Sequence, residues 1–153
     1  MGALQDLIIS TKHAKFDDFP WVEMFPGMEL KICQARPDEN FLVNKFRAQP
    51  FAKSGLHKHM APLFGITLYG AWSHHPTNFA YQPDSFITEP VDELHRFHNG
   101  PDLTEVIYIM FGGAKDFDEE GREEIGSYTC GDMVARYLER CEELGLARPN
   151  ILR

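Results

Sequence analysis

Short runs of β-branched and aromatic residues follow one another along most of the chain, with turn signals between them. Pro37-Asp38-Glu39-Asn40 separates two of these runs, and Gly112-Gly113 ends the last one. Many short strands with turns between them are typical of an antiparallel sandwich or barrel. We therefore predict strands at residues 21–23, 28–36, 41–48, 64–73, 79–81, 85–88, 93–98 and 105–111.

The pattern changes after Gly131 to that of an amphipathic helix. Apolar residues recur at helical spacing from Met133 to Leu144. Asp132 is placed to cap the N-terminus of this helix, and Gly145 lies just past its last turn, where glycine commonly ends helices. We expect one helix near residues 132–144, with its apolar side packed on the barrel.

The chain has 153 residues, a length that suits one domain with a core of its own. We divide it into an N-terminal arm at residues 1–20, a barrel at 21–118, and a helix with its tail at 119–153. The arm contains a weakly amphipathic piece at residues 4–9. We expect the arm to pack on the outside of the domain or on a partner subunit.

Charge and composition narrow the classes of function. The formal net charge of −8 at pH 7 argues against nucleic acid as a partner. No apolar run approaches the length of a membrane span, and the first residues show no signal-peptide pattern. Cys33, Cys130 and Cys141 are scattered and form no CxxC pair, which indicates reduced thiols in a cytoplasm.

His57 and His59 are separated by a single residue. On a strand, residues i and i+2 share a face, so both imidazoles would point the same way, with Lys58 on the opposite face. Two neutral imidazoles side by side form half of a first-row metal site. A chain with seven histidines can produce this pair by chance, so the prediction depends on a third ligand.

The residues around this pair match the two motifs of the cupin family. The matches are His57, His59 and Gly70 in the first motif, and Pro90, His95 and Asn99 in the second. Asp84 and Asp92 replace the two glycines of the second motif, at turn positions where Asp is among the better substitutes. The chain thus resembles a cupin, which implies a single-domain, all-β jelly-roll barrel with the predicted C-terminal α-helix packed on it.

The chain departs from the first motif at the position of its glutamate, which is Leu63 here. The remaining ligand candidates are His57, His59 and His95. This set resembles the three-histidine branch of the cupin dioxygenases, in particular the acetylacetone-cleaving and 2,4′-dihydroxyacetophenone dioxygenases. Some of those enzymes carry an acidic ligand on the strand after the glycine of the first motif, where this chain has Ser73-His74-His75-Pro76.

The resemblance implies an enzyme, an oxidoreductase that uses O₂ to cleave a carbon–carbon bond in a diketone or a hydroxyketone. The implied cofactor is Fe(II), held by His57, His59 and His95. A bidentate small-molecule substrate and O₂ would occupy the open positions, so that no side chain need act as the essential base. Because cupins commonly pair, and because the arm offers apolar side chains, we also expect a homodimer.

Two other functions fit the same residues. Imidazole also accepts Zn, Mn and Ni, so the chain could be a cupin isomerase or hydrolase that uses one of these ions. It could also be a metal-binding cupin without catalytic activity, such as a sensor. Metal analysis followed by O₂ uptake with a panel of diketones separates the three.

The other histidines have less specific interpretations. His74 and His75 lie on opposite faces of their strand, so only one faces inward, as a polar rim residue in preference to a fourth ligand. We place His98 opposite His95, either on the surface or in packing between sheets, and His13 on the surface.

The acidic and apolar residues near the motifs are expected to be structural. We assign Glu89 and Glu93 to the turn beside Pro90. Leu63 is expected to form an apolar wall, with water, substrate or His75 where the motif glutamate would lie. Phe64, Phe86 and Phe97 are expected in the core, and Cys130 and Cys141 outside the metal site.

Overall fold

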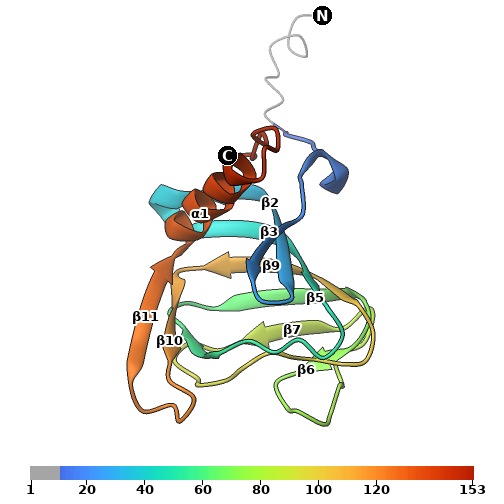
Figure 1. Cartoon of the computed structure of the whole chain (residues 1–153), viewed down its shortest axis with the longest axis vertical. Coiled ribbons are helices and arrows are strands. Elements are labelled where there is room, and N and C mark those ends of the chain that lie inside the picture. Colours follow the sequence, from blue (N-terminus) through green and yellow to red (C-terminus); the bar gives the residue numbers. More distant parts are fainter. Residues whose placement is uncertain (1–10) are drawn as a thin grey trace, which may run out of the picture.

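Antiparallel strands form most of the computed structural model, which describes residues 11–153 (Figure 1). Two 3₁₀ turns and one α-helix complete it. The strands are β1 (Val22–Phe25), β2 (Met28–Arg36), β3 (Phe41–Ala48), β4 (Leu56–His59), β5 (Leu63–Tyr69), β6 (Trp72–Ser73), β7 (Phe86–Glu89), β8 (His98–Asn99), β9 (Thr104–Phe111), β10 (Gly113–Phe117) and β11 (Glu124–Thr129). The helical elements are η1 (Phe16–Asp18), η2 (Pro37–Glu39) and α1 (Cys130–Glu143).

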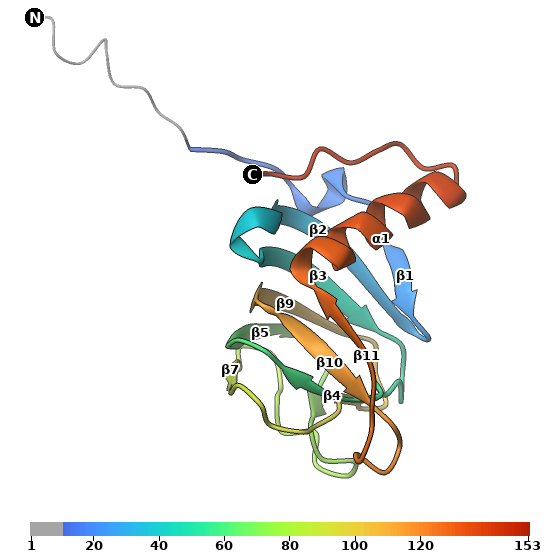
Figure 2. The same cartoon turned by 90° about the vertical axis from the view of Figure 1, so that its left-hand side faces the viewer.

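The strands form a larger sheet and two smaller ones. The larger sheet has the order β1-β2-β3-β9-β5-β7, and the smaller ones are β11-β10-β4 and β6-β8. Figure 2 shows β4, β10 and β11 in a second layer, which faces the larger sheet, with α1 lying across one end. The prediction of an all-β domain with one C-terminal helix is confirmed.

Strict alternation on β3 and β9 builds the core between the layers. Every second residue of β3 is buried, beginning with Leu42, and the same holds for β9, beginning with Thr104. The two strands pair along their full length, so that Leu42 lies opposite Met110 and Phe46 opposite Val106. Because side chains of a strand alternate between its faces, this register brings all the buried residues to one side of the sheet.

The strand predictions differ from the structure at several places. Strands β10 and β11 were not predicted, and residues 79–81 form only an isolated bridge between Tyr81 and Trp72. Strand β11 pairs with β10 through Thr129, so the sheet continues past the predicted end of the barrel at residue 118. The predicted strand at 93–98 forms only an isolated bridge at His95 before β8 begins at His98. Asp92 just before it has a positive φ of 64°, which breaks the extended backbone.

The two aspartates that replace motif glycines both adopt the left-handed conformation. The φ angle is 72° at Asp84 and 64° at Asp92. Most L-residues avoid this region, whereas Asp tolerates it better because its short polar side chain can bond locally. The turns required by the second motif are therefore present without its glycines.

Helix α1 begins two residues before the predicted position. Thr129 is the N-cap, and its side chain accepts a hydrogen bond from Asp132 N at 3.0 Å. Asp132 is at N3 and accepts in return from Thr129 N at 2.8 Å, so it completes a capping box and is not the cap itself. At the other end, Leu146 N donates to Cys141 O and Gly145 N to Glu142 O, and Gly145 has a φ of 67°. This C-terminal motif confirms the predicted role of Gly145.

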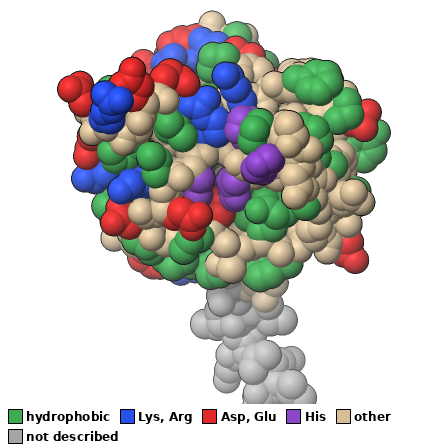
Figure 3. Space-filling model, turned by 90° about the horizontal axis from the view of Figure 1, so that it is seen from below, with side chains coloured by type: hydrophobic (Ala, Val, Ile, Leu, Met, Phe, Trp, Pro, Cys, Tyr) green, Lys and Arg blue, Asp and Glu red, His purple; other side chains and the backbone are tan. Residues whose placement is uncertain are grey.

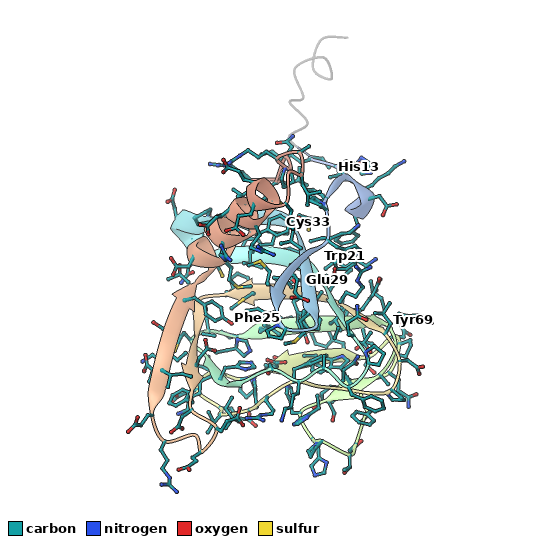
Figure 4. All side chains as sticks on the ribbon, viewed as in Figure 1. His13, Trp21, Phe25, Glu29, Cys33 and Tyr69 are labelled. Carbon is teal, nitrogen blue, oxygen red and sulfur yellow. The ribbon has the colours of Figure 1, made fainter. Side chains whose placement is uncertain are left out.

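The described part of the N-terminal arm packs on the outer face of the larger sheet. The Trp21 ring lies 4.2 Å from the Arg47 guanidinium and 5.0 Å from Lys31 Nζ, which donates to Phe16 O (Figure 4). Cation–π contacts of this kind stabilise a folded chain by about 0.5–1 kcal/mol each at exposed sites. The predicted amphipathic piece at residues 4–9 lies outside the described residues.

The three cysteines are free thiols, as predicted. Cys130 and Cys141 are buried residues of α1 and do not belong to the histidine cluster, and Cys33 is half-buried. Between residues 11 and 153, the only α-helix described is too short and too polar to cross a bilayer.

Candidate metal centre

Strand β4 places His57 and His59 on one face, as their spacing predicts. The strand pairs with β10, with His57 opposite Asp116 and His59 opposite Ala114. Lys58 points to the other face, where its Nζ lies 3.2 Å from Asp92 Oδ1. The two imidazole centroids are 5.0 Å apart.

His95 lies directly beside His57, although it belongs to a different segment. The two residues exchange both backbone hydrogen bonds, His57 N to His95 O at 2.9 Å and His95 N to His57 O at 3.0 Å. The ring of His95 is 4.8 Å from that of His57 and 5.2 Å from that of His59. The three predicted ligands are therefore brought together.

Glu89, at the end of β7, adds a carboxylate to this group. It is 4% exposed, and its Oε2 lies 2.7 Å from His59 Nε2 and 3.2 Å from His95 Nε2. The assignment of Glu89 to an outer turn is wrong, because β7 continues up to Pro90 and turns this side chain inward. Glu93, by contrast, is exposed in the loop as expected.

Glu89 occupies the place that the cupin glutamate would have, reached from the neighbouring strand. Leu63, at the glutamate position of the first motif, lies directly opposite Glu89 in the β5–β7 register. Directly opposed residues have their Cβ atoms about 4.5–5.5 Å apart on the same face. A side chain as long as Glu can therefore reach the same point from either strand. Leu63 itself contributes an apolar wall, as predicted.

These four side chains fit a divalent cation. His57, His59, Glu89 and His95 each offer one donor atom, and the four atoms lie within 4.8 Å of one another. Neighbouring ligands of an octahedral ion with bonds near 2.1 Å are ~3 Å apart, close to the two Glu89–histidine distances. His95 Nε2 is buried and has only the Glu89 carboxylate, at 3.2 Å, as a polar neighbour, so a cation between the two would satisfy both. A His₃–Glu cluster of this kind can hold a metal ion.

Electrostatics also favour a cation in this cluster. Burial lowers the pKa of His57 to about 4, so its imidazole is neutral, and its Nδ1 donates to Gly55 O at 3.0 Å. Burial by itself would raise the pKa of Glu89, but hydrogen bonds from His59, His74 and His95 outweigh it and hold that pKa well below its ordinary value. The cluster thus combines the neutral imidazole of His57 with the ionised carboxylate of Glu89.

His74 is the inward-facing member of the His74-His75 pair. Its Nε2 donates to Glu89 Oε1 at 3.0 Å, and its ring stacks on His95 with centroids 4.4 Å apart. Tyr81 donates from its hydroxyl to His74 Nδ1 at 3.3 Å. His74 therefore holds the free oxygen of Glu89 in place, and the suggestion that His75 occupies the glutamate position is wrong. His75 is exposed and bonds to Thr77.

The remaining predictions near the site have mixed outcomes. His98 is half-buried in β8 and lines a surface groove, as expected for a residue outside the cluster. Phe97 is in the core, 6% exposed, but Phe86 is 65% exposed, so its assignment to the core is wrong. Phe86 lies on the outer face of the edge strand β7, and the described residues leave most of it uncovered.

A cavity of about 410 Å³ opens from the cluster into the space between the two layers. Most of its walls are apolar, and the aromatic members are Phe25, Phe46, Phe97, Tyr108, Phe117 and Tyr128. The polar lining includes Asn44, Lys53 and Asp116, and burial raises the pKa of Asp116. Figure 3 shows histidine side chains gathered on the lower face of the molecule, beside acidic ones.

Sequence reasoning missed Glu89, Asn44 and Asp116. The alternation of Ile87 and Glu89 along β7 was visible, since the two residues share a face. Pro90, however, indicated a turn at this point. Which strand lies beside β5 depends on the pairing of segments far apart in the chain, and no local pattern specifies it.

No family model and no curated protein matches the sequence. Solved structures do match the fold. A cupin protein from Ralstonia eutropha has a TM-score of 0.83 and 17% identity, and the match covers 95% of this chain and 96% of that one. An acetylacetone dioxygenase from Acinetobacter johnsonii has a TM-score of 0.72 and 15% identity, with 87% and 93% covered.

Structures with other activities match more weakly. A polyketide cyclase from Streptomyces resistomycificus has a TM-score of 0.55 at 18% identity, over 78% of this chain and 84% of that one. A sugar phosphate isomerase from Silicibacter pomeroyi has a TM-score of 0.53 at 20% identity, over 70% and 82%. At these identities the matches establish the architecture and leave the reaction open. The chain therefore has the cupin fold, with a cluster of three histidines and one glutamate that can hold a metal ion.

Proposed function

We propose that the protein is a metal-dependent dioxygenase that cleaves a carbon–carbon bond in a small diketone or hydroxyketone. His57, His59, His95 and Glu89 would bind the ion, with Fe(II) as the first choice. The observation that carries this proposal is the convergence of four donor atoms within 4.8 Å at one side of an apolar cavity. Acetylacetone dioxygenases among the structural matches support it.

Fe(II), when bound, supplies a Lewis acid for the substrate oxygens and a redox partner for O₂. Glu89 changes the expected donor set, because its carboxylate adds one negative charge to three neutral imidazoles. Substrate and O₂ would share the positions on the ion that the four protein donors leave open. His74 keeps the carboxylate oriented through its bond to Oε1, and such supporting contacts are typically worth 10–100-fold in metal affinity.

The cavity walls suit an apolar substrate. Leu63, Phe97 and Met110 lie beside the cluster on the inner face, and apolar walls of this kind bind the substrate body and exclude water from the ion. A volume of about 410 Å³ is within the range of small-molecule sites. The partners proposed for this site are therefore a small molecule and O₂.

The test is metal analysis followed by oxygen consumption. Protein purified without added metal is analysed for iron, zinc, nickel and manganese, and then loaded anaerobically with Fe(II). O₂ uptake is measured with a panel of diketones and hydroxyketones, and the organic products are identified. Iron near one equivalent per chain with substrate-dependent uptake supports the proposal. Stoichiometric zinc and no uptake with any member of the panel would exclude it.

A cupin isomerase with Zn, Mn or Ni is the second candidate, and Asp116 favours it. Asp116 lines the same cavity, lies opposite His57 across β4–β10, and has a pKa raised by burial. A carboxylate with a raised pKa is suited to move a proton next to a carbonyl. Asp116→Asn should abolish an isomerase but spare metal-dependent O₂ uptake, so this variant separates the two functions.

The proposed assembly is a homodimer formed through the outer face of the larger sheet. Phe41, Phe111, Phe64 and Phe86 form a row across β3, β9, β5 and β7, which we call the Phe ladder. Successive rings are 5.0, 6.4 and 6.2 Å apart. A second copy of the same face could cover this row, since exposed apolar patches mark interaction sites. The free thiols support a reducing compartment, and we propose the cytoplasm.

A further inference from the structure

Asn44 is a buried polar residue whose side-chain oxygen has no hydrogen-bond donor within the protein. It lies on β3 between Leu42 and Phe46, on the inward-facing side of the strand, and is 3% exposed. Its Oδ1 is buried and accepts no hydrogen bond. Buried amides are nearly always bonded, so an unbonded one in a native core calls for an explanation.

The surroundings of Asn44 are apolar and open to the cavity. Asn44 lines the cavity together with Met28, Leu30 and Phe46. It lies opposite Tyr108 on β9, which also lines the cavity. Tyr108 in turn lies opposite Gly65 on β5, where a Cβ would come within 2.9 Å of the Tyr108 ring. Gly65 therefore makes room for the Tyr108 ring, and the cavity that Tyr108 and Asn44 both line gives a ligand access to the amide.

Another buried asparagine shows what a structural role looks like in this fold. Asn99 donates from Nδ2 to the backbone oxygens of Ala48, Gln49 and Asp102 at 3.2, 2.8 and 2.9 Å. Asn99 thereby joins the end of β3 to the turn before β9, and it does not line the cavity. Although the Oδ1 of Asn99 is also unbonded, its Nδ2 holds two segments of the chain together.

We propose that Asn44 forms a second polar subsite in the cavity, which takes a neutral hydroxyl group of the bound small molecule. An amide presents both an acceptor and donors, and a hydroxyl can match either of them. A charged group is disfavoured because the walls are apolar and ionised groups are costly to bury there. No protein atom has to move to free the acceptor, because it is already unbonded.

The position of the subsite indicates which end of the ligand it binds. Strand β3 is separated from β7, which carries Glu89, by β9 and β5. Three strand spacings of ~4.8 Å and an offset of two residues along the strands, ~7 Å, separate the two residues by ~16 Å on a flat sheet and by less on a curved one. This part of the inference rests on the proposed function. The metal would hold the ketone oxygens, and Asn44 would select substrates with a hydroxyl at the opposite end.

The first test is the stability of the metal-free protein. Asn44→Leu removes the unbonded amide at nearly constant volume, so its melting temperature should rise by about 2–4 °C. Asn99→Leu is the matched control and should lower it, because three backbone oxygens lose their donor. A fall in the melting temperature of Asn44→Leu would mean that Asn44 is structural, and would overturn the proposal.

The second test measures ligand preference without metal. Metal-free wild type and Asn44→Leu are titrated with p-cresol and toluene, which differ by one hydroxyl, and binding is followed by NMR. The preference for p-cresol over toluene should be about tenfold greater in the wild type, as expected for one hydrogen bond to an otherwise unsatisfied group. An equal preference in the two proteins, or no binding of either probe to the wild type, would overturn the proposal.

The third test joins the subsite to the metal. Zinc-loaded protein is titrated with 1-phenylbutane-1,3-dione and its 4-hydroxyphenyl analogue. The wild type should favour the hydroxylated compound about tenfold more than Asn44→Leu does, with equal metal content in both. A wild type that binds no metal would contradict the proposed function alone, because the first two tests need none. Metal binding with no change in preference would contradict the proposed orientation.

Discussion

Strand β7 places two side chains in environments that are the reverse of the usual ones. Glu89 is a carboxylate and is 4% exposed, whereas Phe86 is a large aromatic residue and is 65% exposed. Glu89 faces inward beside Leu63, and Phe86 faces outward beside Phe64, with their rings 6.2 Å apart. At the same sheet edge, the inner face therefore buries a charge and the outer face exposes an apolar ring.

This comparison shows how exceptions to ordinary burial point to function. A buried charge is costly unless it is paired, and here the pairing groups are imidazoles that suit a cation. An exposed aromatic row is unusual unless another surface covers it. The inner face is thus suited to an ion, and we propose that a second protein surface covers the outer face. The following predictions test each point.

The largest effect is expected from removing a histidine of the inner cluster. His59→Ala or His95→Ala should reduce bound metal from about one equivalent to near zero, because each removes a direct donor. Metal content after dialysis, measured by plasma mass spectrometry, checks this. His98→Ala should leave the metal content unchanged. Loss of metal in His98→Ala but not in His95→Ala would mean that the cluster is wrongly assigned.

Glu89 and Leu63 can be exchanged across the strand pair. Glu89→Leu should weaken metal binding by about 100-fold, since it removes the only carboxylate of the cluster. The double variant Leu63→Glu, Glu89→Leu places a carboxylate on the opposite strand, and it should bind metal roughly tenfold more tightly than Glu89→Leu does. Competition with a chromophoric chelator measures both. Equal affinity of the wild type and Glu89→Leu would show that Glu89 is not a ligand.

The metal-free protein should lose stability in mild acid. The pKa of His57 is about 4 in the folded protein, against an ordinary value of 6.5. Between these two pH values the unfolded chain therefore binds a proton at His57 and the folded chain does not. Stability should therefore be full above pH 6.5 and fall as the pH decreases toward 4. Glu89, whose folded pKa is depressed, adds a further loss below its ordinary value.

Thermal unfolding of the metal-free protein at pH 7 and pH 5 measures this loss. The melting temperature should drop by several degrees for the wild type, and by less for His57→Gln, which cannot titrate. An identical drop in both proteins would assign the acid sensitivity to other groups.

On the outer face, we expect a smaller effect that is confined to association. Phe86→Ser should weaken the dimer by about tenfold while changing the melting temperature of the monomer little, because the side chain is already 65% exposed. Sedimentation velocity over a range of concentrations measures the dissociation constant. Phe51→Ser is the matched control, since Phe51 is 70% exposed but lies outside the Phe ladder. A monomeric wild type at micromolar concentration would contradict the homodimer.

Much of the molecule was predictable because its signals are local. The alternation in β3 and β9, the i, i+2 spacing of His57 and His59, and Gly145 after the helix each depend on residues a few positions apart. The helix start was missed by two residues because Thr129 and Asp132 both have side chains that cap helices. Only the reciprocal bonds between them identify Thr129 as the cap.

Local patterns in the chain were enough to predict the all-β fold, the shared face of His57 and His59, and the motif that brings His95 beside them. Three other features emerge only when the chain is folded: Glu89 completes the cluster, Asn44 lines the cavity unbonded, and Phe86 is uncovered. The two groups differ because side-chain alternation is a property of one strand. Which residues lie opposite one another depends instead on the register between strands, and the β5–β7 register puts Glu89 across from Leu63.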